Sequence, residues 1–350
     1  MVDVAEVAAN VSGTINGRYM ITEMVDDPIK RDYGVYNVYD HENPEIPTQA
    51  YIANPGCILV RRHNVQHSRW RQSMAATQMV LETVRGRSLH FPKLVKAGRV
   101  RRLVFGAEGV QEFENDPDCH RTVIIIKSPL PYQLLSHFVS FSPTGTLPVD
   151  LALHIGMGMV RALAALHRSG FVHRLVSPHS FSYITPPTID NLVNRLIITD
   201  LSLCMPWPIR PRTVTPFIGS MRYSALRVHE GREQGPSTDI QSVVFVVAEL
   251  ISGRQVTSKV AIFNVNFSLA WRSVVRLNMA CEMKELFPET QEFRRLPREI
   301  RALYRDMMLT SSQSVLDYNA IQGAFKSALD RRSQSKSIDL PMWLYQPCDE

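Results

Sequence analysis

The chain has 350 residues, of which 45% are hydrophobic and 21% charged, with a formal net charge of +6. These figures are those of a folded, soluble protein that can bury a large core. The most apolar stretch, residues 243–251, is about half the length needed to cross a bilayer. Residues 1–15 lack the basic start and the apolar run of a secretory signal. We therefore expect an intracellular protein of the cytoplasm, with the nucleus as a further compartment, and no membrane partner.

The five cysteines and the basic residues argue against two kinds of site. The cysteines are scattered and odd in number, without C-x-x-C spacing, which argues against a zinc site or a disulfide framework. The basic residues form only short clusters, and no nucleic-acid-binding module accompanies them. A solvated basic surface or a site for an acidic partner is favoured over nucleic-acid binding.

The N-terminal third is predicted to be rich in strands. Residues 18–24, 33–39 and 49–53 alternate apolar and polar side chains, with β-branched and aromatic members. Residues 68–85 lack Gly and Pro and carry apolar side chains at helical spacing, which predicts one helix. Two further strand segments, 94–105 (with a break) and 122–127, follow that helix.

From residue 149 onward the pattern predicts helices. The expected helices are 151–168, 238–252, 268–287, 298–309 and 316–329, and the segment 331–350 reads as a loosely packed tail. Helix 238–252 is apolar on most sides, which is typical of burial. A small strand-rich lobe with one helix, followed by a larger helical lobe, is an α+β fold.

Three segments at a characteristic order and spacing carry the chemical signal. The first is Gly170-Phe-Val-His-Arg-Leu-Val-Ser-Pro-His-Ser-Phe181, directly after a helix. The second is Ile198-Thr-Asp-Leu-Ser202. The third is Gly219-Ser-Met-Arg-Tyr-Ser-Ala225, followed by Gly231-Arg-Glu-Gln234 and Thr238-Asp-Ile-Gln-Ser242.

These segments resemble the catalytic loop H-R-D-x-x-x-x-N, the D-F-G motif and the helix-opening Asp of protein kinases. The third segment is similar to the casein kinase I superfamily, and most of all to its tau-tubulin-kinase-like branch. The resemblance implies a bilobal kinase-like domain over residues 17–330, with an N-lobe of about 17–128 and a C-lobe of about 129–330. Residues 1–16 and 331–350 would flank it.

The resemblance also implies that the catalytic loop is degenerate. The catalytic Asp falls on Leu175, which has no group to accept the proton of a substrate hydroxyl. The Lys that steadies the transferred phosphate falls on Ser177, and the magnesium-binding Asn falls on Ser180. The Asp of D-F-G is retained as Asp200, so binding of ATP and Mg²⁺ stays an open alternative. Asp200 is the candidate metal ligand, with a local hydrogen-bonding function as the alternative.

The N-lobe motifs are altered as well. In the glycine-rich loop the third glycine is retained as Gly34, a candidate cofactor contact, whereas the first two fall on Ile29 and Arg31. The strand lysine that pairs with ATP falls on Ala53 or on Arg61, and the helix glutamate that pairs with it falls near Thr77. Side chains in the glycine loop are expected to crowd the approach of the backbone to phosphates.

Other retained residues have two interpretations each. In the resembled kinases His173 packs on the D-F-G backbone and Arg174 organises the activation segment, and a structural function is favoured for both. Arg222, with Arg232 nearby, implies a site for an anion or a partner protein, because an arginine fork binds two phosphate oxygens. Bracing of the activation segment is the equal alternative. Thr213 and Thr215 are weaker candidates as phosphorylation sites.

Two kinds of function remain open from the sequence. The leading hypothesis is a catalytically inactive pseudokinase that binds a protein partner, such as an active kinase or a phosphorylated or acidic protein. The alternative is an enzyme, either a weak serine/threonine kinase or a transferase that holds the nucleotide in another pose. Loss of the general base alone costs roughly 10²–10⁴ in rate, which favours the first. Nucleic-acid binding through the basic surface is the third hypothesis.

Overall fold

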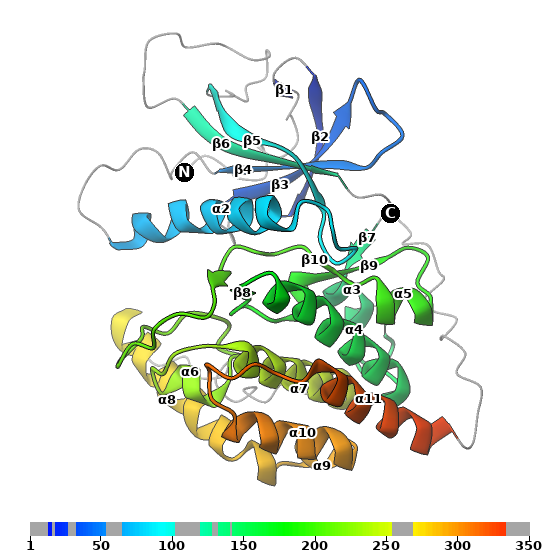
Figure 1. Cartoon of the computed structure of the whole chain (residues 1–350), viewed down its shortest axis with the longest axis vertical. Helices are drawn as coiled ribbons and strands as arrows, with labels where there is room; N and C mark the ends of the chain where they lie inside the picture. Colours follow the sequence, from blue (N-terminus) through cyan, green and yellow to red (C-terminus); the bar gives the residue numbers. More distant parts are fainter. Residues whose placement is uncertain are drawn as a thin grey trace. The chain divides into compact units, whose positions relative to one another are not determined.

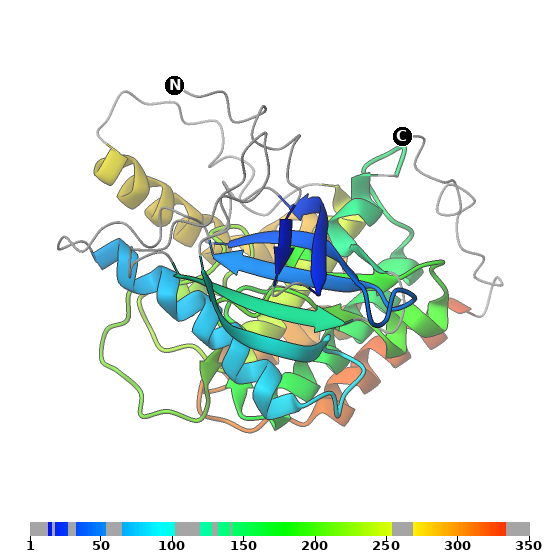
Figure 2. The same ribbon diagram turned by 90° about the horizontal axis from the view of Figure 1, so that it is seen from above.

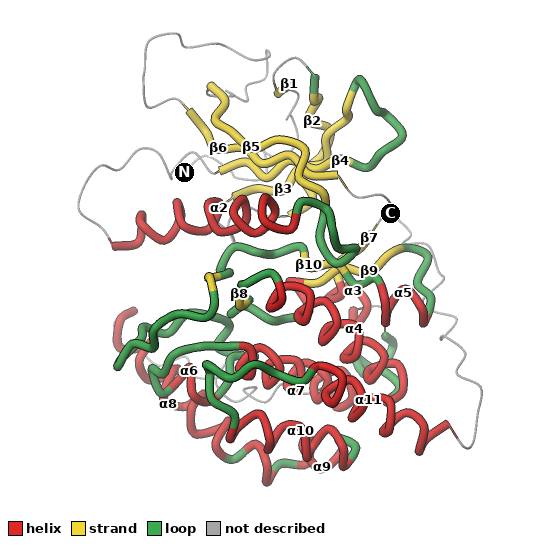
Figure 3. Tube along the Cα trace, viewed as in Figure 1, coloured by secondary structure: helices red, strands yellow, loops and turns green. Residues whose placement is uncertain are grey.

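A computed structural model describes residues 13–15, 18–26, 33–53, 65–101, 120–127, 132–140, 142–253 and 269–333. The chain divides into two compact units, Met1–Pro131 and Tyr132–Glu350. Strands gather in the first unit and helices in the second, as Figure 3 shows. This is the bilobal α+β architecture that the sequence predicts.

Unit 1 is built on an antiparallel sheet of six strands in the order β1-β2-β3-β4-β6-β5. The strands are β1 (Gly13–Ile15), β2 (Tyr19–Asp26), β3 (Tyr33–Asp40), β4 (Thr48–Ala53), β5 (Lys93–Arg101) and β6 (His120–Lys127). Helix α2 (Val65–Val84) contacts β5 and β6 and runs beside them in Figure 2.

Alternation of side chains along the strands divides the apolar residues of the sheet between its two faces. One face holds a buried cluster that includes Tyr36, Ala50, Ile52 and Val123. Val35 and Tyr51 are paired across β3 and β4, and as neighbours of these residues they occupy the opposite face. Among the α2 residues whose side chains are described, 74–84, those that are buried are Met74, Ala76, Thr77, Val80, Leu81 and Val84.

Unit 2 is organised around two buried helices, α4 (Val149–Arg168) and α7 (Pro236–Ser252), which contact each other (Figure 1). Around them lie α3 (Leu135–Ser140), α5 (Ile189–Asn194), α6 (Leu226–His229), α8 (Leu269–Glu285), α9 (Gln291–Arg295), α10 (Arg298–Leu309) and α11 (Tyr318–Ser333). Helix α7 begins with Pro236 at its first position and ends at Gly253, whose φ of 66° suits glycine.

Short strands fix the loops of unit 2. Strand β9 (Phe181–Ile184) lies between β7 (Tyr132–Leu134) and β10 (Ile197–Ile198), and β8 (Phe171–Val172) pairs with β11 (Met205–Pro206). The chain thus leaves β8, passes through residues 173–180 and enters β9, so that both ends of this loop are held in sheets.

Helix α4 is long and apolar enough to cross a membrane by length and composition, with a mean hydropathy of 1.5 over an 18-residue window. However, 67% of that window is buried inside the structure, which is also typical of a core helix. The sequence analysis identified the most apolar stretch as residues 243–251, which lie in α7. Burial of α4 against α5, α7 and α11 accounts for its composition.

Candidate functional site

The loop between β8 and β9 is held by one buried carboxylate from the first turn of α7. Asp239 accepts the backbone N–H of His173 at 2.7 Å and that of Arg174 at 2.9 Å. Arg174 has a φ of 65°, an uncommon conformation for a residue with a side chain. Two hydrogen bonds to a charged acceptor help to hold this strained backbone in place.

Asp239 is itself fixed by a chain of side chains that reaches α11. His167 of α4 contacts Asp239 through Nε2 at 2.9 Å, and its Nδ1 meets the hydroxyl of Tyr318. Burial raises the pKa of Asp239, but the hydrogen bonds from the His167 side chain and the His173 backbone outweigh it and hold the pKa below its ordinary value. The carboxylate therefore stays ionised, and four segments of unit 2 meet at it.

Leu175, Ser177 and Ser180, the three loop residues that differ from the kinase pattern, are joined by hydrogen bonds. The Ser180 hydroxyl lies 2.6 Å from the Leu175 carbonyl oxygen and donates to it. The Ser177 and Ser180 hydroxyl oxygens are 3.0 Å apart, and both serines are buried. The Leu175 N–H donates to Nδ1 of His173 at 3.1 Å. The loop is closed by internal hydrogen bonds, with an apolar side chain at the position of a general base.

Asp200 does not belong to a set of ligands suited to two magnesium ions. Its Oδ1 accepts the backbone N–H of Ser202 at 3.0 Å, and the residue is 5% exposed. Its expected metal-binding partner, Ser180, uses its hydroxyl on Leu175. Within the described ranges no group of three His, Cys, Asp or Glu side chains is placed to hold a metal ion. Magnesium at nucleotide sites is held by one or two carboxylates together with substrate phosphates, so Asp200 could supply one such ligand, whereas the Ser180 hydroxyl is already bonded to Leu175.

His173 and Arg174 both face buried surroundings. The His173 ring stacks on Phe181 with centroids 5.8 Å apart, and burial lowers its pKa despite the nearby charges of Asp239 and Asp200. A neutral imidazole in the core holds the loop rather than exchanging protons with solvent. Nε of Arg174 donates to the carbonyl of Leu203 at 2.7 Å. Leu203 begins residues 203–224, the segment that we call the activation segment.

The activation segment is pinned to the turn after α6. The Arg212 guanidinium binds the carboxylate of Glu233 with two hydrogen bonds of 2.8 and 3.0 Å. The Thr215 N–H donates to the carbonyl of Gly231, and its hydroxyl donates to that of Arg232. Thr215 is thereby buried, whereas Thr213 is exposed. Of the two candidate phosphorylation sites, Thr213 alone presents its hydroxyl to solvent in this arrangement.

Glycine is required where the activation segment meets the catalytic loop. Gly219 has a φ of 139°, and a Cβ there would lie 2.5 Å from Oγ of Ser224 and 2.8 Å from the carbonyl oxygen of Arg174. A side chain would push the segment away from the loop.

Arg222 and Arg232, the two arginines predicted to bind an anion or a partner, have no described contact with each other. Arg222 interacts with Glu249 of α7 at 3.8 Å and lies over the ring of Tyr223, and 39% of its side chain is exposed. Arg232 pairs with Glu230 at 3.1 Å, with 67% of its side chain exposed. Each has a carboxylate of the chain itself as a described partner, and Arg222 also donates to the hydroxyl of Tyr223 at 3.4 Å.

In unit 1 the structure describes part of the predicted nucleotide site. Ile29, Arg31 and Arg61 lie outside the described residues. Gly34 lies in β3, where a Cβ would come within 2.6 Å of the ring of Tyr36. Ala53 ends β4, and Thr77 is fully buried in α2.

Tyr51 is a change that the sequence analysis missed. It lies two residues before Ala53 and is 2% exposed. If the lysine of the kinase strand pattern V-A-I-K falls on Ala53 rather than on Arg61, Tyr51 takes the place of its small alanine. The buried phenol therefore adds bulk to the strand that carries the altered lysine position. Comparison of residues 50–53 with that pattern would have found it.

Lys284 and Arg227 are two further residues that no sequence pattern singles out. Lys284 of α8 is fully buried, and its amino group donates to the carbonyl of Ser224. Arg227 of α6 is half-buried beside Arg232. Burial of a cation depends on neighbours that are distant in the sequence, so no local sequence pattern predicts it.

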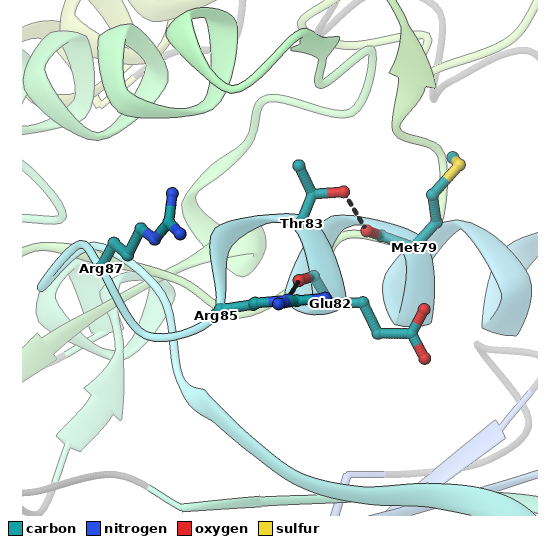
Figure 4. A pocket seen from close by; sticks show the side chains of 5 residues that line it. All are labelled: Met79, Glu82, Thr83, Arg85 and Arg87. Atoms are coloured by element: carbon teal, nitrogen blue, oxygen red, sulfur yellow. Dashed lines mark hydrogen bonds between the residues drawn. The ribbon is translucent and has the colours of Figure 1, made fainter.

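A shallow concavity lies at the carboxyl end of α2 in unit 1 (Figure 4), with a volume of about 370 Å³. It is lined by Met79, Glu82, Thr83, Arg85 and Arg87. Nε of Arg85 donates to the carbonyl of Glu82, and the Thr83 hydroxyl donates to that of Met79. Cations at this end of a helix complement its dipole, which explains the arginines without a ligand.

The chain is similar to several curated kinases. It is 28% identical over 185 residues to a putative casein kinase I of Caenorhabditis elegans, covering 50% of this chain and 49% of that one. It is 32% identical over 109 residues to a probable casein kinase I homologue of Encephalitozoon cuniculi, covering 29% and 34%.

A third relative is a C. elegans protein described as an inactive tau-tubulin kinase, 30% identical over 111 residues, covering 29% and 38%. The chain spans about half the length, or less, of these relatives. No family model matches the chain.

Proposed function

The chain contains a casein-kinase-I-like kinase domain, and we propose that this domain transfers no phosphate and acts as a protein-binding module. The observation that carries the proposal is the closed catalytic loop, in which the Ser180 hydroxyl donates to the carbonyl of Leu175. Leucine at the base position has no acceptor for the proton of an attacking hydroxyl, and no described polar group of the loop replaces it.

The magnitudes support this proposal. Loss of general-base catalysis alone lowers a rate by about 10²–10⁴, which is about 3–5.5 kcal/mol of barrier. Ser177 in place of lysine and Ser180 in place of asparagine remove a phosphate contact and a metal ligand as well. These losses do not add simply, but together they reduce a typical kinase turnover of about 1–100 per second to a negligible rate.

The altered nucleotide positions support the same conclusion. The kinase lysine falls on Ala53 or on Arg61, and the partner glutamate falls near Thr77. With the lysine at Ala53, Tyr51 stands where the pattern has alanine. Asp200 already accepts a hydrogen bond from Ser202. We therefore expect no productive binding of ATP with Mg²⁺.

The binding partner in this proposal is a protein, either an active kinase or a phosphorylated or acidic protein. The support is the surface of the activation segment and the turn after α6, which presents Arg222 and Arg232. A cytoplasmic or nuclear location is part of the same proposal.

A thermal titration separates this proposal from the nucleotide-dependent alternatives. A ligand that binds the folded state at 100 times its Kd stabilises it by about 2.7 kcal/mol. We expect no rise in the unfolding midpoint of the whole chain with millimolar ATP and Mg²⁺. A rise that Asp200→Ala abolishes would favour a weak serine/threonine kinase or a transferase instead.

A further inference from the structure

The turn after α6 brings together two arginines that are five residues apart. The N–H of Arg232 donates to the carbonyl of Arg227 at 2.9 Å, and the N–H of Gly231 donates to that of Val228 at 3.2 Å. Gly231 has a φ of 71°, which lets the chain reverse here. A Cβ on Gly231 would lie 3.3 Å from the carbonyl oxygen of Thr215, so the activation segment packs directly on this turn.

The charges at this turn are not balanced. Arg212 is neutralised by its two hydrogen bonds to Glu233. One further carboxylate, Glu230, pairs with Arg232 and also acts on Arg227. Across the described residues the Arg227 guanidinium has no ion pair or hydrogen bond. In this part of the chain one carboxylate, that of Glu230, therefore faces two guanidinium groups.

Arg227 is held in an unfavourable setting. Burial lowers its pKa, and the like charge of Arg232 lowers it further, against the opposite effect of Glu230. A half-buried cation next to a second cation gains more from an incoming anion than an exposed cation does, because less solvent screens the interaction. Arg232, with 67% of its side chain exposed, leaves the approach from solvent open.

We propose that Arg227 and Arg232 form a binding site for a phosphorylated serine or threonine side chain of a partner protein. The inference rests on the proposed protein-binding function and selects the phosphorylated protein among its partners. The site is separate from Arg222, whose described partners are Glu249 and Tyr223.

A phosphate suits this site better than a carboxylate. Glu230 already gives Arg232 a carboxylate partner at 3.1 Å, so a second carboxylate offers Arg232 little that it lacks. A phosphate monoester carries about −1.5 to −2 charges and three acceptor oxygens. It therefore binds both guanidinium forks at once and competes with Glu230 for Arg232.

The test uses the full chain with isotope-labelled arginine, observed by NMR at the Nε–H groups. The signals of Arg227 and Arg232 are assigned from the variants Arg227→Lys and Arg232→Lys. The probes are an alanine-rich peptide with one phosphoserine, its unphosphorylated form, inorganic phosphate and a short single-stranded oligonucleotide. We expect both signals to shift in a saturable way with the phosphopeptide, and neither to shift with the unphosphorylated peptide.

Matched variants test how the affinity for the phosphopeptide depends on these arginines. Arg232→Gln should weaken phosphopeptide binding by about tenfold or more, since hydrogen bonds to charged groups contribute about 1.5–3 kcal/mol. The double variant Arg294→Gln/Arg295→Gln removes two exposed charges on α9 and should change the affinity less than about twofold. Unchanged unfolding midpoints show that the variants remain folded.

Four results would overturn the inference. They are no shift at either arginine, an equal loss of binding in the α9 variant, free phosphate binding as tightly as the phosphopeptide, and tighter, steeply salt-dependent binding of the oligonucleotide. None of them bears on whether the domain transfers phosphate, so this inference and the proposed absence of catalysis fail independently.

Discussion

Lys284 is the residue whose environment departs furthest from that of its type. Its side chain is fully buried, its amino group lies 4.3 Å from the ring centroid of Phe245, and it donates to the carbonyl of Ser224. Burial lowers its pKa well below the ordinary value for lysine. The end of the activation segment is thus tied to α8 by an amino group that is held towards its neutral form.

This setting predicts a specific pH dependence of stability. Between the lowered folded-state pKa of Lys284 and its ordinary value near 10.5, the unfolded chain binds one more proton than the folded chain. In that window the stability of the wild type should rise with pH relative to Lys284→Met, by about 1.4 kcal/mol per pH unit. Urea unfolding of both proteins at pH 7, 8 and 9 measures the difference.

The control is Lys326→Met, which removes an exposed lysine on α11. Its stability relative to the wild type should not change over the same pH range. A Lys284→Met difference as flat as that of Lys326→Met would show that Lys284 is not held neutral in the folded state.

Among the elements, α4 and α5 approach so closely that one position tolerates no side chain. A Cβ on Gly158 of α4 would lie 1.9 Å from the carbonyl oxygen of Leu192 in α5 and 2.9 Å from a methyl group of Leu196. Backbone cannot move away as the tip of a flexible side chain can. The spacing of α4 and α5 therefore depends on this glycine.

Gly158→Ala should destabilise the protein by about 3 kcal/mol, the upper range for overpacking a core. The matched change is Gly323→Ala in α11, where a Cβ meets no other atom within 4 Å. This second change should stabilise the protein by about 0.8–1 kcal/mol through helix propensity. Urea unfolding of each variant measures both changes in stability. Similar stabilities for the two variants would contradict the close approach of α4 and α5.

Elements with strong local patterns were predictable from the sequence. Helix α10 begins at Arg298 and ends at Leu309, as its apolar spacing predicts, and β3 and β4 match their predicted strands within one residue. Two-residue strands such as β8 and β11 were not predicted. They form because segments that are distant in the sequence pair with each other, and two residues are too few to show a hydrophobic periodicity.

Some features of the candidate site were likewise predictable from the sequence, and others were not. Loss of a carboxylate at Leu175 can be read from the sequence, since it concerns the identity of one residue. The hydrogen bond from Ser180 to Leu175, the burial of Lys284 and the approach of Arg232 to Arg227 cannot. These depend on how the chain turns between the residues, and side-chain types alone do not determine that.

At the scale of the whole molecule, the hydrogen bonds that hold the fold are present, whereas the positions of the kinase catalytic motifs carry other residues. Asp239, His167 and Tyr318 still join four segments of unit 2 around an ionised carboxylate. The activation segment is still pinned by Arg212 and Glu233. In the proposed alignment with the kinase motifs, leucine and serine stand where those motifs have the residues that accept a proton and hold a second magnesium. A surface supported by an intact scaffold is what a binding function needs.

The central claim is that this domain transfers no phosphate, and a phosphotransfer assay tests it most directly. The full-length chain is incubated with labelled ATP and Mg²⁺, with casein and with itself as acceptors, beside the variant Asp200→Ala. We predict incorporation no higher than that of the variant. Magnesium-dependent transfer that Asp200→Ala abolishes would contradict the account.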